Sequence, residues 1–117
     1  MNTHSGPDPR SPETRRALDA IRAVGGDELV EAMSSAFLAF AAAQEEWLAR
    51  QFLAKNFEAV AEGARALRIS ALQLGAGDVA AACAAAELAG AGGDAAAVQG
   101  ALEQLSLALV GVRKALG

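Results

Sequence analysis

The chain has 117 residues, of which 53% are apolar, and a formal net charge of −4 at pH 7. This length supports one core of useful size, so we expect a single domain. With four Phe, one Trp and no Tyr, that core must be filled by Ala, Leu and Val, which favours closely packed helices. No Lys or Arg occurs between Arg68 and Arg113, so the chain lacks the basic stripe of a nucleic-acid-binding protein.

The same composition argues against export and membrane insertion. No segment approaches the roughly 20 strongly apolar residues that a membrane span needs. The first ten residues, Met1 to Arg10, lack the apolar core of a signal peptide. We therefore expect a cytoplasmic protein. Cys83, the single cysteine, lies in an Ala-rich run and is expected to be a buried small side chain without redox or metal function.

The N-terminal part is expected to contain a tail and a short helix. Residues 1–10 hold two prolines and a glycine with no periodicity, so they are expected to be disordered. Ser11 followed by Pro12 predicts an N-cap and a first helical turn. This helix is expected to end at Gly25 and Gly26.

A long helix is predicted next, capped by Asp27 and ending near Lys55. One stripe along it is apolar except for a single glutamine: Leu29, Met33, Phe37, Phe40, Gln44, Trp47 and Leu48. Phe40 and Trp47 are expected to lie in the core or to cover the N-terminal helix.

Asn56 breaks that run, and the following helix has a seam of apolar residues at steps of three and four: Phe57, Val60, Ala64, Leu67, Ala71 and Leu74. Gly75 to Gly77 predict a turn, and Asp78 is expected to cap a short helix that ends at the glycines 90–93. Asp94 is expected to cap the last helix, whose core face comprises Val98, Leu102, Leu105, Leu109, Val112 and Leu116. Short glycine turns force antiparallel neighbours, so residues 11–117 are predicted to form an all-α, up-down antiparallel four-helix bundle with an extra N-terminal helix.

The run Ala64-Arg65-Ala66-Leu67-Arg68-Ile69-Ser70, continuing to Leu74-Gly75, resembles the phosphoacceptor helix of histidine-containing phosphotransfer (HPt) domains. That helix follows the pattern Ala-His-x-Leu-Lys-Gly-Ser-x-x-x-Leu-Gly. Residues 18–29, 56–59 and 112–116 also resemble segments of this family. Arg65 stands at the position of the phosphoacceptor histidine.

The resemblance implies a phosphotransfer scaffold without the transfer chemistry. The family's histidine attacks a phosphoryl group through a neutral ring nitrogen with a free lone pair, whereas the guanidinium of Arg65 stays protonated and offers only donors. His4, the only histidine, lies in the tail without a framework to position it. We therefore expect no enzyme activity, no catalytic residue, no cofactor and no metal site.

The helix that carries Arg65 has its seam on the other side, so Arg65 is expected to face solvent or a partner. Ile69 replaces the glycine that the family prefers four residues after the histidine. Arg68 retains the positive charge of the family's lysine, and Glu62 could pair with Arg65 at i, i+3. With Leu72, these residues form a candidate partner-binding face, although a simple solvated face is the plainer alternative.

A second exposed apolar pair is predicted on the last helix, where Leu107 and Val110 point away from the core beside Gly100 and Gly111. This pair is a candidate contact of a weak homodimer.

Two functions follow from these patterns. The leading expectation is a non-catalytic, HPt-like signalling module that binds a response-regulator receiver domain or a histidine kinase as an antagonist or adaptor. The alternative is a helical structural or oligomerisation module that associates through its last helix and has no phosphorelay partner. Arg65 could also be an isolated inactivating exchange in an active protein, but Ile69 argues against it because such an exchange would leave the neighbouring glycine in place.

Overall fold

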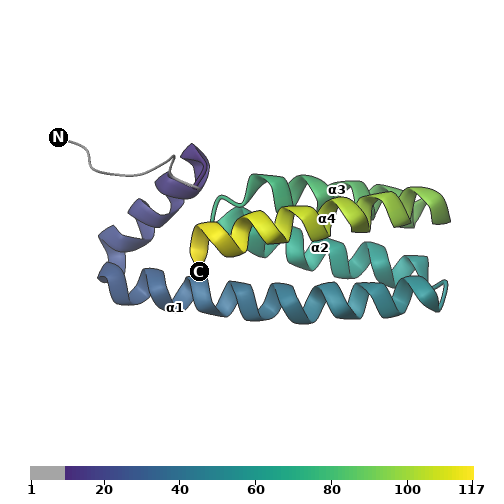
Figure 1. The fold of residues 1–117 in the computed structure, drawn as a ribbon, viewed down its shortest axis with the longest axis horizontal. Helices are drawn as coiled ribbons and strands as arrows, with labels where there is room; N and C mark the ends of the chain where they lie inside the picture. Colours follow the sequence, from purple (N-terminus) through teal and green to yellow (C-terminus); the bar gives the residue numbers. More distant parts are fainter. Residues whose placement is uncertain (1–9) are drawn as a thin grey trace.

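The computed structural model describes residues 10–117 and contains four helices and no strand within that range. The helices are α1 (Pro12–Leu53), α2 (Phe57–Gln73), α3 (Gly77–Ala91) and α4 (Ala95–Leu116). Each helix packs against its neighbour in the chain, and α4 also packs against α1 (Figure 1). The predicted all-α, up-down four-helix bundle is therefore confirmed, with α2 and α4 at diagonally opposite corners.

Three residues join each pair of successive helices, and the middle residue of each connection has a positive φ. These residues are Lys55 (φ 59°), Gly75 (φ 66°) and Gly93 (φ 66°). A left-handed residue just past a helix ends the helix and turns the chain back. The short turns thus account for the antiparallel order.

Side-chain caps explain three of the four helix starts. Ser11, Asn56 and Asp94 each accept a hydrogen bond from the backbone N–H three residues further on, as N-caps do. The expectation for Asp78 was wrong, because α3 starts at Gly77 with Ala76 as its uncapped N-cap residue. Asp78 instead lies in the first turn of α3.

The expected N-terminal helix forms the first part of α1, which is broken at Gly26 (φ 71°, ψ −168°). Beyond this break the long remainder of α1 runs along the bundle (Figure 1). Asp27 does not cap that remainder as expected. Its Oδ1 accepts a hydrogen bond from Arg22 Nε at 2.6 Å, and Arg22 also binds Asp19 Oδ1 at 2.8 Å. The carboxylate of Asp27 is therefore used to bridge the break.

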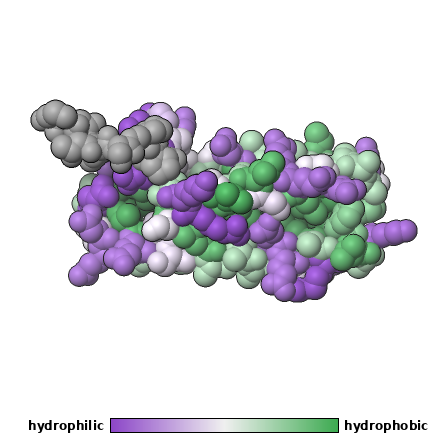
Figure 2. All heavy atoms as spheres, viewed as in Figure 1, coloured by the Kyte–Doolittle hydropathy of each residue, from purple (hydrophilic) through white to green (hydrophobic). Residues whose placement is uncertain are grey.

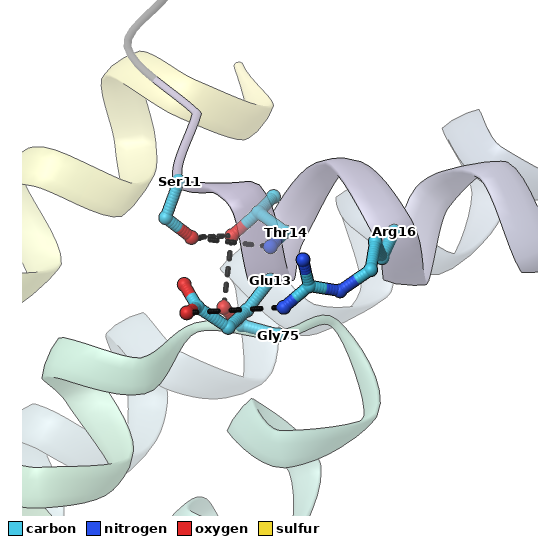
Figure 3. A network of polar contacts seen from close by, with 5 residues as sticks. All are labelled: Ser11, Glu13, Thr14, Arg16 and Gly75. Carbon is cyan, nitrogen blue, oxygen red and sulfur yellow. Dashed lines mark hydrogen bonds and ion pairs between the residues drawn. The ribbon is translucent and has the colours of Figure 1, made fainter.

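We call residues 12–25 the N-terminal segment; it attaches to the turn between α2 and α3 (Figure 3). Buried Thr14 donates its hydroxyl to the carbonyl oxygen of Gly75 at 2.9 Å and accepts a hydrogen bond from the Ser11 hydroxyl at 3.0 Å. A Cβ on Gly75 would lie 2.4 Å from the carbonyl oxygen of Glu13, so only glycine permits this approach. Beside the contact, Arg16 and Glu13 form a loose ion pair at 4.0 Å.

The core is built from small and medium side chains, as the composition predicted. Fully buried positions on all four helices include Leu48, Val60, Leu67, Val79, Cys83, Val98, Leu105 and Leu109. The predicted seam of α2 is buried except for half-buried Phe57. Helices α2 and α3 approach so closely that a Cβ on Gly90 would lie 2.7 Å from the carbonyl oxygen of Phe57.

The expectation for Phe40 was wrong, and that for Trp47 was half right. Phe40 is 37% exposed at the surface between α1 and α2. Trp47 is half-buried and packs against the core, but at α2 and away from the N-terminal segment. The N-terminal segment instead binds the turn at Gly75, far along α2 from Gly63, where Trp47 packs. Phe40 lies closer to that turn, beside Gln73 and Leu74.

Candidate functional site

A line of four exposed residues, which we call the α2 face, follows the outer side of α2. Its members are Glu62, Arg65, Ile69 and Leu72. They alternate in steps of three and four, so they lie above one another on a helix. The buried residues Val60, Ala64, Leu67 and Ala71 occupy the opposite side. Ile69 is 49% exposed and Leu72 is 56% exposed, so the apolar part of this face is open to solvent.

Arg65 presents its guanidinium to solvent without a partner among residues 10–117. The pair with Glu62 that the sequence allowed is not formed, since neither side chain makes an ion pair or hydrogen bond within that range. Both long side chains would lose rotamer freedom in such a pair, for little gain at an exposed site. All the donors of Arg65 therefore remain available to a ligand.

Arg68 occupies a different place from the one that the sequence indicated. It points from α2 toward α3, where its Nε and Nη2 bind the two carboxylate oxygens of Glu87. Both side chains are partly buried, and the carboxylate raises the pKa of Arg68 above its usual value. This bidentate pair links the two helices and neutralises the charge of Arg68. Among the described residues, a partner at the α2 face would meet one unpaired cation, Arg65.

On the other side of Arg65, α1 is locked to α2 by the one polar residue of its apolar stripe. Gln44 Nε2 donates a hydrogen bond to the carbonyl oxygen of Gly63 at 2.9 Å. The ring of Trp47 covers Gly63, where a Cβ would lie 2.5 Å from Cζ3 of the ring. Gln44 and Trp47 thus fix the helix that carries Arg65 against rotation.

Arg65 also borders an open groove of about 550 Å³ between α2 and α3. Alanines line much of the groove, and its other lining residues include Glu62, Arg68, Glu87 and Leu88. Leu88 is 79% exposed. Sequence reasoning missed both Glu87 and Leu88 as parts of this region. The signal was present for Glu87, since it and Asp78 are the only charged residues of α3.

The chemistry of this region is that of a binding surface. Arg65 offers donors but no lone pair. The thiol of Cys83 lies beneath the surface, where burial, followed by the nearby Glu87 carboxylate, raises its pKa to about 12. Across residues 10–117, no group of His, Cys, Asp and Glu side chains is arranged to hold a metal ion. His4 lies outside the described residues.

The second predicted pair lies on the far side of the molecule. Leu107 is 75% exposed and Val110 is 48% exposed, both on the outer side of α4. Because α4 is diagonal to α2, the two apolar surfaces face in opposite directions. Figure 2 shows apolar surface between hydrophilic patches on the side of the bundle where α4 lies.

One further property of α4 differs from the sequence-based expectation. Among the described helices, it is long and apolar enough to cross a membrane by length and composition. The many Ala, Leu and Val residues of α4 give it this apolar composition. In the bundle, however, Val98, Leu105 and Leu109 face the core.

Comparisons of the chain with protein-family models, with curated proteins and with solved structures found no match.

Proposed function

We propose that this chain is a non-catalytic signalling module of the phosphorelay type, which binds a receiver domain or a histidine kinase through the α2 face. The observation that carries the proposal is the unpaired Arg65 beside exposed Ile69 and Leu72 on one rigid helix. The resemblance of residues 64–75 to the phosphoacceptor helix supports the choice of partner. The helical bundle is compatible with it, and such partners would place the module in the cytoplasm.

The expected binding mode combines one charge with one apolar anchor. A phosphorylation pocket rimmed with carboxylates, as the resemblance implies for a receiver, would accept bidentate hydrogen bonds from Arg65. Arginine there would occupy the pocket without transferring a group, so the module would act as an antagonist or adaptor. Burying the exposed halves of Ile69 and Leu72 together contributes about 1.5–3 kcal/mol, and an exposed ion pair contributes about 1 kcal/mol or less. Ile69 and Leu72 together should therefore supply most of the affinity, while Arg65 supplies specificity.

Titration calorimetry against the receivers and kinases of the same genome tests this proposal. Ile69→Asp should abolish most of the binding, and Arg65→Ala should weaken it more at low salt than at high salt. Val24→Asp is the matched control, because Val24 is 84% exposed on the N-terminal segment, away from the α2 face. If Ile69→Asp and Arg65→Ala bound the partner as tightly as the wild type and Val24→Asp, the α2 face would be refuted as the binding surface.

The alternative function, a structural or oligomerisation module without a phosphorelay partner, is favoured by the exposed pair Leu107 and Val110. It would be preferred if no receiver or kinase bound while the chain associated with itself.

A further inference from the structure

The outer side of α4 carries four exposed residues in one line: Glu103, Leu107, Val110 and Lys114. The line lies opposite the buried residues Val98, Ala101, Leu105, Leu109 and Val112. Glu103 and Lys114 have no ion pair with any residue from 10 to 117. Within residues 10–117, the two charges therefore have no ion-pair partner, and the two apolar side chains are exposed.

The order of these residues is self-complementary. The spacing is four, three and four residues, and the sequence of chemistry is acid, apolar, apolar, base. A second copy of α4 laid antiparallel, with its two-fold axis between Ala108 and Leu109, brings Leu107 against Val110 of the second copy. The same register brings Glu103 against Lys114 of the second copy, and the symmetry repeats both contacts.

The flank of this line is also shaped for a close neighbour. Gly100 and Gly111 lie beside Leu107, and a Cβ on either glycine would meet nothing within 4 Å. Internal packing therefore does not require glycine at these two positions, although glycine disfavours a helix interior relative to alanine. An adjoining helix could approach closely there. We propose that the chain forms an antiparallel homodimer through α4, with Glu103 and Lys114 setting the register.

This dimer does not depend on a phosphorelay role. Helices α2 and α4 are diagonal, so two copies joined through α4 leave both α2 faces exposed on opposite outer sides. The dimer would thus present two binding faces of the same kind, pointing away from each other. One helix per copy makes a small interface, so a weak, concentration-dependent dimer is expected.

Sedimentation equilibrium of the full chain tests the association. The mass should rise from 11.8 kDa toward twice that value as concentration increases. Leu107→Glu should keep the chain monomeric, whereas Leu88→Glu should not. The two leucines are matched, being 75% and 79% exposed on different helices. A wild-type chain that stays monomeric at about 1 mM would overturn the proposal, since that concentration detects even very weak association.

A charge exchange tests the register. Glu103→Lys and Lys114→Glu each replace two attractive contacts by two repulsive ones, so each variant should dimerise roughly tenfold more weakly at low salt. An equimolar mixture of the two variants should form a heterodimer as strong as the wild type, because both contacts then join opposite charges. In a parallel dimer, like residues would already face each other in the wild type, so neither single variant would dimerise more weakly than the wild type, and the mixture would dimerise more strongly than the wild type. The antiparallel register would be overturned if the wild type dimerised but the single variants dimerised equally well, or if the mixture did not recover the strength of the wild type.

Discussion

Burial between the helices changes the chemistry of single side chains in this protein. Cys83 is the clearest case, since its thiol is fully buried and its pKa is raised from 9.0 to about 12. Unfolding exposes the thiol and returns its pKa to the usual value. Above pH 9 the unfolded state loses this proton first, so the free energy of unfolding should fall by up to about 1.4 kcal/mol per pH unit until pH 12.

Denaturant titrations between pH 8 and pH 11 check this prediction. The wild type should lose more stability over that range than Cys83→Ala, which lacks the titrating group. In the native state at pH 8, an alkylating reagent should leave Cys83 unmodified. Rapid alkylation without denaturant, or equal pH slopes for the two proteins, would contradict the buried neutral thiol.

Arg65 permits a second residue-scale prediction. The wild type should accept no phosphoryl group from a phosphorylated receiver or a small phosphodonor, because Arg65 has no lone pair. Arg65→His supplies a nucleophile on the exposed side of α2, but Ile69 one turn further along crowds its approach. Phosphorylation followed with a labelled donor should therefore be detectable in Arg65→His and faster in the double variant with Ile69→Gly. Equal rates in the single and double variants would show that Ile69 does not hinder access.

At the scale of elements, the helix ends show what the sequence could and could not predict. Ser11, Asn56 and Asp94 sit at helix boundaries as expected, because capping involves only residues close in the chain. Asp27 was misassigned because Arg22 competes for its carboxylate across a break in the backbone. Helix capping can be predicted from the sequence unless the capping side chain binds a competing partner instead.

The same contrast applies to the candidate site. The outward direction of Arg65, Ile69 and Leu72 follows from helical periodicity, and all three are exposed. The pair between Arg68 and Glu87 could not be predicted, because it depends on the rotation and axial offset of α2 against α3. Periodicity defines the faces of each helix, whereas tertiary packing decides which faces meet.

The turns between helices give a matched test of packing against backbone conformation. Gly75 and Gly93 have the same φ of 66°, but only Gly75 would place a Cβ against the backbone of the N-terminal segment. Gly93→Ala should cost about 1–2 kcal/mol for its left-handed conformation. Gly75→Ala should cost about 1–3 kcal/mol more, because Glu13 and Thr14 must move away.

Thermal or denaturant unfolding of the two variants measures this difference. Hydrogen exchange locates it, since Gly75→Ala should selectively speed exchange at the N-terminal segment, which only Thr14 and Leu18 anchor with buried side chains. Equal destabilisation of the two variants would mean that the segment does not rest on the turn.

At the scale of the whole molecule, the ring order of the four helices separates the two candidate interfaces. The α2 face and the outer side of α4 lie on opposite sides of the bundle and share no residue. Substitutions at distant sites without shared partners usually act independently. Ile69→Asp should therefore abolish partner binding while leaving the sedimentation behaviour unchanged, and Leu107→Glu should abolish self-association while leaving the affinity of each α2 face unchanged. To test this independence, partner affinity and sedimentation behaviour are measured for Ile69→Asp, for Leu107→Glu and for the double variant. If Leu107→Glu also weakened partner binding by more than about threefold, the coupling would exceed what independent sites show, and the two surfaces would have to communicate through the core that α2 and α4 enclose with α1 and α3.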